Sequence, residues 1–179
     1  EFNNNYYPRF SNYNVSTPTK AILSGSYFFA SPSKPTQPLG FISADVEFVN
    51  YSNTKYYTLD NDASVVNYYQ DLNNIIKNTY KNAVNFKIGS EIKLSKSWLA
   101  RAGAAYYGSP YKDNGISAAN MSLSGGLGYR MGNQFIDFTF INISSKDAIF
   151  PYRLIDKDNY YAEQKSNRMI LSIGYGIKF

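Results

Sequence analysis

The chain has 179 residues, of which 17% are aromatic and 17% are charged, and its formal net charge is +5. It contains neither histidine nor cysteine, which excludes histidine-based acid–base catalysis, disulfides and the usual zinc sites. We therefore expect neither an enzyme nor a metal- or cofactor-binding protein. Because the basic residues are scattered and form no stripe, we also expect no nucleic-acid partner.

The first half of the sequence alternates between loop-like and strand-like segments. Residues 1–18 are rich in asparagine, are interrupted by two prolines and predict an extracellular loop or irregular segment, with a short strand over residues 6–10 as the alternative. Strands are predicted over residues 20–30 and 41–51. The stretch "SPSKPTQPLG" between them contains three prolines and a glycine and predicts a break.

One amphipathic helix is predicted inside the long segment 52–82. Apolar residues recur there at helical spacing, and Asp62 or Ser64 could cap the start of the helix. The residues in this pattern are Val65, Tyr69, Leu72, Ile75, Ile76 and Tyr80.

The second half predicts further strands over residues 83–94, 98–107, 121–131 and 135–143, and a last strand after residue 165. The turns "SKS" and "GN" are short, whereas "GSPYKDNGISAAN" and residues 144–165 are long loops. The alternation slips near Ile141, which predicts a bulge or the end of that strand.

Each predicted strand has one apolar face. In the last strand every second residue from Met169 to Phe179 is apolar, while the intervening positions are mostly small or charged. Charged residues of the other strands also lie opposite the apolar face, namely Lys87, Glu91, Lys93, Arg101, Arg130 and Asp137. A soluble sandwich would turn the apolar faces inward, and a membrane barrel would turn them outward.

Loop lengths favour the barrel, because the first, third and fifth connections are short and the other three are long. Outer-membrane barrels have this asymmetry, and strands of 9–12 residues suit a tilted crossing. We therefore predict an all-β fold: an antiparallel transmembrane β-barrel in the outer membrane of a Gram-negative bacterium. Residues 19–179 would form the barrel, and the helix would lie in an extracellular loop.

Aromatic residues near the strand ends predict interface girdles that contact lipid and lipopolysaccharide, namely Trp98, Tyr106, Tyr129 and Tyr175. The alternating C-terminus with its final aromatic residue resembles the signature that the barrel-insertion machinery reads in outer-membrane proteins. By that resemblance the signature is carried by Leu171, Ile173, Tyr175, Ile177 and Phe179.

Seven strands do not close a usual bacterial barrel, in which the number of strands is even. Either residues 1–18 supply an eighth strand, or residues 19–179 are the C-terminal part of a larger barrel. We expect the second, so that an N-terminal barrel half or another chain is a partner.

Four stretches follow one another along the chain: "VSTPTKAILSGSYFF", "FISADVEFVNYSNTKY", "FKIGSEIKLSKSWLARAGAAYYGSPYKD" and "SGGLGYRMGNQFIDFTF". Together they resemble the C-terminal half of the FadL/TodX-type outer-membrane transport proteins over about residues 15–179, most specifically in "RAGAAYYGSPYKD" followed by "GLGYR". The resemblance implies a barrel of about fourteen strands with an N-terminal hatch that carries long-chain fatty acids or other hydrophobic molecules inward. This sequence contains neither the hatch nor the N-terminal strands, so no transport path is carried over residue by residue.

We expect passive uptake of a hydrophobic small molecule. The helix would collect it through Tyr68, Tyr69, Leu72, Ile75 and Ile76. The lumen would bind it through Phe28, Phe41, Arg101, Tyr107 and Arg130. In the alternative reading of these residues, the helix merely caps the barrel and the arginines pair with Asp45, Glu47, Glu91 and Asp137. A scaffold or shuttle in a secretion-type outer-membrane complex and a polar-solute porin are the competing functions.

Overall fold

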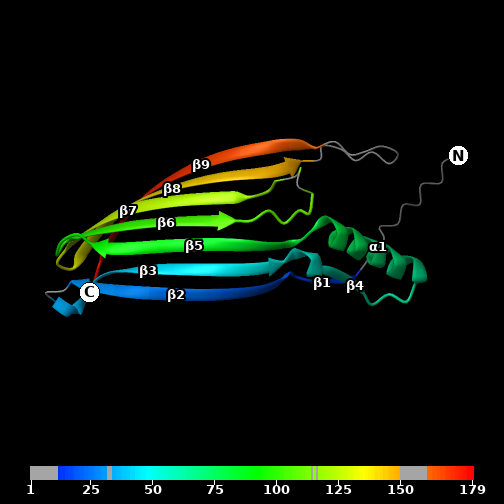
Figure 1. The fold of residues 1–179 in the computed structure, drawn as a ribbon, viewed down its shortest axis with the longest axis horizontal. Helices are drawn as coiled ribbons and strands as arrows, with labels where there is room; N and C mark the ends of the chain where they lie inside the picture. Colours follow the sequence, from blue (N-terminus) through cyan, green and yellow to red (C-terminus); the bar gives the residue numbers. More distant parts are fainter. Residues whose placement is uncertain (1–11, 32–33, 114, 116, 150–160) are drawn as a thin grey trace.

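Seven strands form one antiparallel sheet in the computed structural model, which describes residues 12–31, 34–113, 115, 117–149 and 161–179. Each strand of this sheet pairs with the next one along the chain, in the order β2-β3-β5-β6-β7-β8-β9 (Figure 1). The strands are β2 (Thr19–Ser31), β3 (Lys34–Asn50), β5 (Asn82–Lys93), β6 (Trp98–Tyr107), β7 (Asn120–Met131), β8 (Gln134–Ile149) and β9 (Ala162–Ile177). The predicted all-β, antiparallel fold is thus confirmed.

Short and long connections lie at opposite ends of the sheet. Residues 94–97 join β5 to β6, and Gly132 and Asn133 join β7 to β8, where Gly132 has a φ of 58° that favours glycine. The backbone N–H of Lys178 donates to the carbonyl of Asn133 at 2.7 Å, which places the end of the chain beside these turns. The opposite end carries the longer connections, as the position of α1 in Figure 1 shows.

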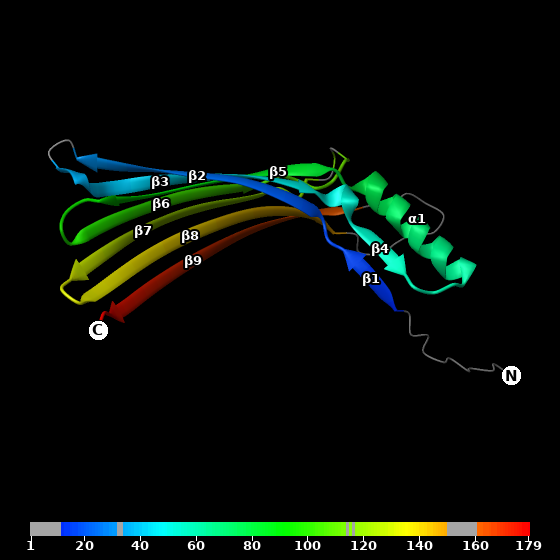
Figure 2. The same ribbon diagram turned by 90° about the horizontal axis from the view of Figure 1, so that it is seen from below.

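A small unit extends from the long-loop end of the sheet (Figure 2). It contains β1 (Tyr13–Ser16), which pairs with β4 (Lys55–Thr58), together with the 3-10 turn η1 (Tyr51–Asn53) and α1 (Ala63–Thr79). The predicted helix is confirmed, and the carboxylate of Asp62 accepts a hydrogen bond from the backbone N–H of Ser64 at 2.8 Å as its N-cap. Sequence reasoning did not anticipate the β1–β4 pair, and the alternative strand over residues 6–10 lies outside the described residues. No described helix is long and apolar enough to cross a bilayer.

Three strands are longer than the sequence pattern indicates. β3 already begins at Lys34, although Pro35 and Pro38 lie in its first part. Prolines are tolerated there because β3 pairs with β5 only from Gly40 onward, and its register against β2 is irregular before that residue.

The prediction that β8 bulges or ends near Ile141 is wrong. The register of β8 runs unbroken through Ile141 against both β7 and β9, so Ile141 neither forms a bulge nor ends the strand. Residues 144–149 and 162–165, expected as loop, continue the β8–β9 ladder instead. Backbone pairing between the two strands thus extends past the point where the apolar alternation stops.

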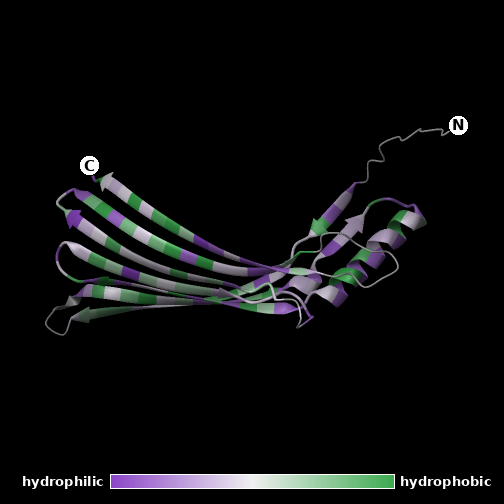
Figure 3. Ribbon diagram, turned by 90° about the horizontal axis from the view of Figure 1, so that it is seen from above, coloured by the Kyte–Doolittle hydropathy of each residue, from purple (hydrophilic) through white to green (hydrophobic). Residues whose placement is uncertain are grey.

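The sheet is curved (Figures 2 and 3), and few of its described side chains are buried. Directly paired residues of antiparallel strands share a face, so the register assigns every strand position from Gly40 to Ile177 to one of two faces. Large apolar side chains dominate one face and remain open, among them Leu23, Phe86, Leu123, Phe138 and Ile173. We call this the apolar face and the other the polar face. In the described part of the chain, the buried apolar side chains are limited to Val49, Tyr69, Ile76, Ala83 and Leu99.

Candidate functional site

The polar face carries one charged group at its long-loop end, which we call the Glu47 cluster. Glu47 and Asn85 are both buried, at 5% and 3% exposure, and the Asn85 amide donates to Glu47 Oε1 at 2.6 Å. Lys20 Nζ lies 3.3 Å and Lys87 Nζ 4.0 Å from Glu47 Oε2. Asn85 Oδ1 also accepts from the backbone N–H of Gly108, so the cluster ties β2, β3 and β5 to the loop that follows β6.

A second group, the Arg101 cluster, lies closer to the short turns. Arg101 donates from Nε to Glu91 and from an Nη to Asp137, both at 2.7 Å. The bridge therefore joins β5, β6 and β8 across the intervening β7. It crosses β7 over Gly128, where an added Cβ would lie 2.6 Å from Asp137 Oδ1. Glycine at this position leaves room for the ion pair.

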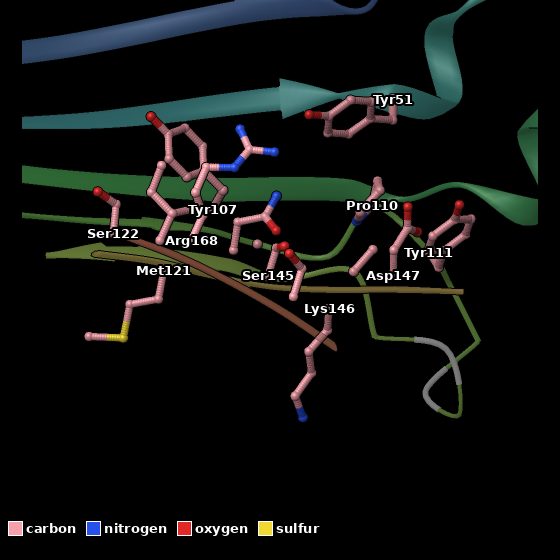
Figure 4. Close-up of a pocket in the computed structure, with 15 residues that line it drawn as sticks. Tyr51, Tyr107, Pro110, Tyr111, Met121, Ser122, Ser145, Lys146, Asp147 and Arg168 are labelled. Atoms are coloured by element: carbon pink, nitrogen blue, oxygen red, sulfur yellow. The ribbon is translucent and has the colours of Figure 1, made fainter. Parts of the chain in front are cut away.

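A cavity of about 740 Å³ opens on the polar face at the long-loop end (Figure 4). Its lining includes Tyr51, which follows β3, and Arg168 of β9 at the far side of the sheet, so the cavity extends across most of the polar face. Figure 4 shows Ser122 and Ser145 on the side of this cavity, whereas Met121 and Lys146 point away from it. Aromatic, hydroxyl and guanidinium groups together could hold a molecule that is partly apolar and partly polar.

The loop after β6 is held against the helix end beside this cavity. Tyr80 and Tyr111 form an isolated antiparallel bridge, and their rings stack with centroids 5.3 Å apart. Burial, reinforced by Tyr80 and the nearby Asp147, raises the pKa of Tyr111 above its usual value. Tyr111 therefore stays an uncharged phenol through the physiological pH range.

The structure brings some of the expected lumen residues together. Phe28 lies opposite Phe41 with ring centroids 5.7 Å apart, and the same cross-strand row continues to Glu91 and Arg101. Tyr107 is separate from them: it lines the loop-end cavity, and Lys87 Nζ lies 5.6 Å from its ring centroid.

The arginines are held in different ways. Arg130 places its guanidinium 5.4 Å from the centroid of Phe135, near the short turns. Arg101 forms ion pairs with the carboxylates of Glu91 and Asp137, as the alternative reading of the arginines predicted. Sequence reasoning missed Tyr51 and Arg168 as cavity residues. Period-two alternation puts Arg168 on the polar face, but the cavity wall beside it is completed by Ser145 and Asp147, which the sequence pattern placed in a loop.

The helix residues proposed as a collector point in different directions. Tyr69 and Ile76 are buried, and the Tyr69 ring stacks against Tyr56 with centroids 6.3 Å apart. Leu72 is half-buried, so the open apolar side chains of α1 are Tyr68 and Ile75, exposed by 63% and 61%. The Asn73 side chain fixes α1 to β4 by accepting from the Tyr56 N–H at 2.7 Å and donating to its carbonyl at 2.9 Å.

The expected girdle residues fall into two rows of the apolar face. Trp98, Tyr129, Ile136 and Tyr175 are consecutive cross-strand partners near the short turns, and the Trp98 and Tyr129 rings are 4.9 Å apart. Tyr106 begins a second row near the long loops, where it lies opposite Met121. Of the C-terminal signature, Leu171, Ile173, Tyr175 and Ile177 are exposed on β9, and Phe179 lies beyond the strand and is fully exposed.

No protein-family model and no curated protein matches this chain. In the part of the chain that the structure describes, no group of three or more histidine, cysteine or acidic side chains could hold a metal ion. The polar face carries ion pairs, hydroxyl groups and tyrosine rings.

Proposed function

We propose that this chain forms part of an outer-membrane β-barrel of the FadL/TodX type that admits hydrophobic small molecules passively. The observation that carries the proposal is the continuous apolar face across seven strands, which no other layer of the described chain covers. Burying such a face against hydrocarbon is favourable, whereas leaving it in water is costly. The opposite face carries the ion pairs and the cavity, as the wall of a lumen would.

The size of the apolar band supports the same setting. In β6, Trp98 and Tyr106 mark its two edges, eight residues apart, which is about 26 Å along the strand. Tilted transmembrane strands of 9–11 residues need a band of about this length. The aromatic residues of both rows would then lie at the level of the lipid headgroups.

Closure of the barrel needs strands beyond the seven in this sheet. β2 and β9 are its edges, and as the first and seventh strands of an antiparallel meander they run in the same direction. Direct pairing of β2 with β9 would be parallel, and open edges in lipid leave backbone groups unpaired at a cost of several kcal/mol each. An odd number of further antiparallel strands closes the ring, which fits the family's barrel of about fourteen strands.

The short N-terminal strand does not supply the missing pairing. β1 is engaged with β4 outside the main sheet, so residues 13–16 are not an eighth strand of that sheet. This favours a larger barrel, in which further strands of the same protein or another chain complete the ring.

A hydrophobic solute would enter from the long-loop side. Tyr68 and Ile75 on α1 offer exposed apolar surface there, and the loop-end cavity offers the aromatic rings of Tyr51 and Tyr107. Nearer the short turns, the Phe28–Phe41 pair gives a second apolar contact on the polar face. Contacts of this kind bind a hydrophobic molecule weakly enough for it to move on.

Reconstitution of the full-length protein into liposomes tests this proposal. We expect a fatty acid or an aromatic hydrocarbon to enter faster than into empty liposomes. Ser122→Trp fills the cavity and should slow uptake several-fold, whereas Leu123→Trp, its neighbour on the apolar face, should leave uptake unchanged. Uptake no faster than in empty liposomes would overturn the proposal. A large conductance for small polar solutes with no hydrocarbon uptake would replace it with a porin.

A further inference from the structure

The apolar face carries charge at one place. Of its described strand residues between Gly40 and Ile177, the charged ones are Lys146, Glu163 and Lys165, all on β8 and β9. They lie beyond the apolar band at its long-loop end. A charge within that band would be expensive in lipid, but one just outside it meets the headgroups.

The register fixes the height of these charges. Tyr106, Met121, Ser144 and Asn167 are consecutive cross-strand partners and form the loop-end row of the apolar face. Lys146 and Lys165 face each other two residues beyond this row, about 7 Å farther along the strands. The Lys146 side chain points away from the loop-end cavity of the polar face, on the same side of the sheet as Met121 (Figure 4).

The two lysines border a hollow on this outer surface. A cavity of about 380 Å³ is lined by Tyr106, Met121, Ser144, Lys146, Lys165 and Asn167, among others. It therefore combines an apolar floor with ammonium, hydroxyl and amide groups. The Asn142 amide donates to Asn167 Oδ1 at 2.8 Å, which orients the amide donor of Asn167.

The charge balance at this place favours an anion. Like charges directly opposite each other in a sheet are unfavourable, and an anion between Lys146 and Lys165 would relieve their repulsion. Glu163 lies 3.2 Å from Lys165, but the pair is exposed, with side chains open by 39% and 71%, so it neutralises Lys165 only weakly.

We propose that Lys146 and Lys165 form a binding site for the phosphate groups of lipopolysaccharide in the leaflet on the long-loop side. The site rests on the proposed outer-membrane setting, because the apolar face places it against that leaflet. The lysine ammonium groups bind the phosphates of lipid A, Ser144 and Asn167 contribute hydrogen bonds, and Tyr106 and Met121 contact the sugar and the first acyl carbons.

Binding of lipid A to the detergent-solubilised full-length protein at low salt tests this site. We expect Lys146→Gln combined with Lys165→Gln to weaken binding of bisphosphorylated lipid A at least fivefold, because each lysine contributes to attraction of an anionic surface. Glu163→Gln should strengthen binding, a gain that a misfolded variant would not show. Lys96→Gln, an exposed lysine among the short turns, is the matched control and should bind like the wild type.

The outcomes separate this site from the barrel proposal. Equal binding by the wild type and the double variant, or equal binding of dephosphorylated lipid A, would overturn the site while leaving the barrel untouched. Competition by millimolar inorganic phosphate as effective as by lipid A would assign the lysines to a free anion and overturn the lipid assignment. A wild-type protein that does not insert into vesicles at all would overturn both proposals.

Discussion

Glu47 and Asn85 form the most deeply buried polar contact of the sheet, with 2.6 Å between Glu47 Oε1 and the Asn85 amide nitrogen. Both side chains lie on the face that also holds the cavity. A buried carboxylate is costly unless it is hydrogen-bonded and paired with a cation. Here the Asn85 amide donates to Glu47, and Lys20 and Lys87 balance its charge. The contact makes the polar face a structural element as well as a lining.

Removing the Asn85 side chain should therefore destabilise the sheet. Asn85→Ala leaves Glu47 without its closest donor and the Gly108 N–H without its acceptor, so we expect a loss of about 2 kcal/mol. Urea unfolding in lipid vesicles measures this change. Asn120→Ala, on the same face of β7, is the control and should shift the midpoint far less; equal shifts would contradict the role given to Asn85.

The Arg101 cluster predicts coupled effects of substitution. Arg101→Met leaves Glu91 and Asp137 facing each other without a cation, and because the three side chains are partly exposed we expect a loss of about 1–2 kcal/mol. Adding Glu91→Gln and Asp137→Asn should restore most of the stability, since no uncompensated charge remains. Strictly additive losses in the triple variant would show that the cluster does not act as a unit.

Trp98 reports on the turn-side edge of the apolar band. It is the single tryptophan of this chain, is 46% exposed and stacks against Tyr129. We expect its fluorescence to shift to the blue on insertion into vesicles, and to be quenched more by bromines near the headgroups than by bromines in the middle of the acyl chains. Trp98→Phe subtracts any other emission. Quenching strongest at the bilayer centre would contradict the girdle assignment.

Neighbouring residues of β7 separate the two faces energetically. Leu123 lies on the apolar face and is 47% exposed, whereas Ser122 lines the cavity. In a bilayer Leu123→Arg should cost about 2 kcal/mol or more, and Ser122→Arg much less. In water, an exposed leucine replaced by arginine would change stability by only about 0.5 kcal/mol. Vesicle unfolding of the two variants side by side makes the comparison; equal costs would contradict the membrane orientation.

The order of elements could be predicted from the sequence because period-two alternation and helical spacing are local signals. The patterns at 83–94, 98–107 and 121–131 predicted β5, β6 and β7 to within one residue at each end, and Asp62 marked the start of α1. The faces followed from the same alternation. Alternation and helical spacing can both be read without knowing which strands pair.

The remaining features depend on pairing. β3 tolerates Pro35 and Pro38 because one side of it has no regular partner there, which the proline residues themselves do not reveal. Lys146 and Lys165 read as loop residues in isolation and become strand residues only because β8 and β9 support each other. The partnership of Arg101 with Asp137 likewise spans a strand, and so could be proposed from charge but not assigned.

Spin labelling along β7 tests most directly whether the apolar face meets hydrocarbon. The chain has no cysteine, so single cysteines can be placed at each position from 121 to 131 without removing any native one. In lipid vesicles, we expect nitroxides at 121, 123, 127, 129 and 131 to collide with oxygen, and those at the even positions to collide with a water-soluble nickel chelate. This orientation would be contradicted if the protein stayed monodisperse without detergent and nitroxides at the odd positions were shielded from both oxygen and the nickel chelate.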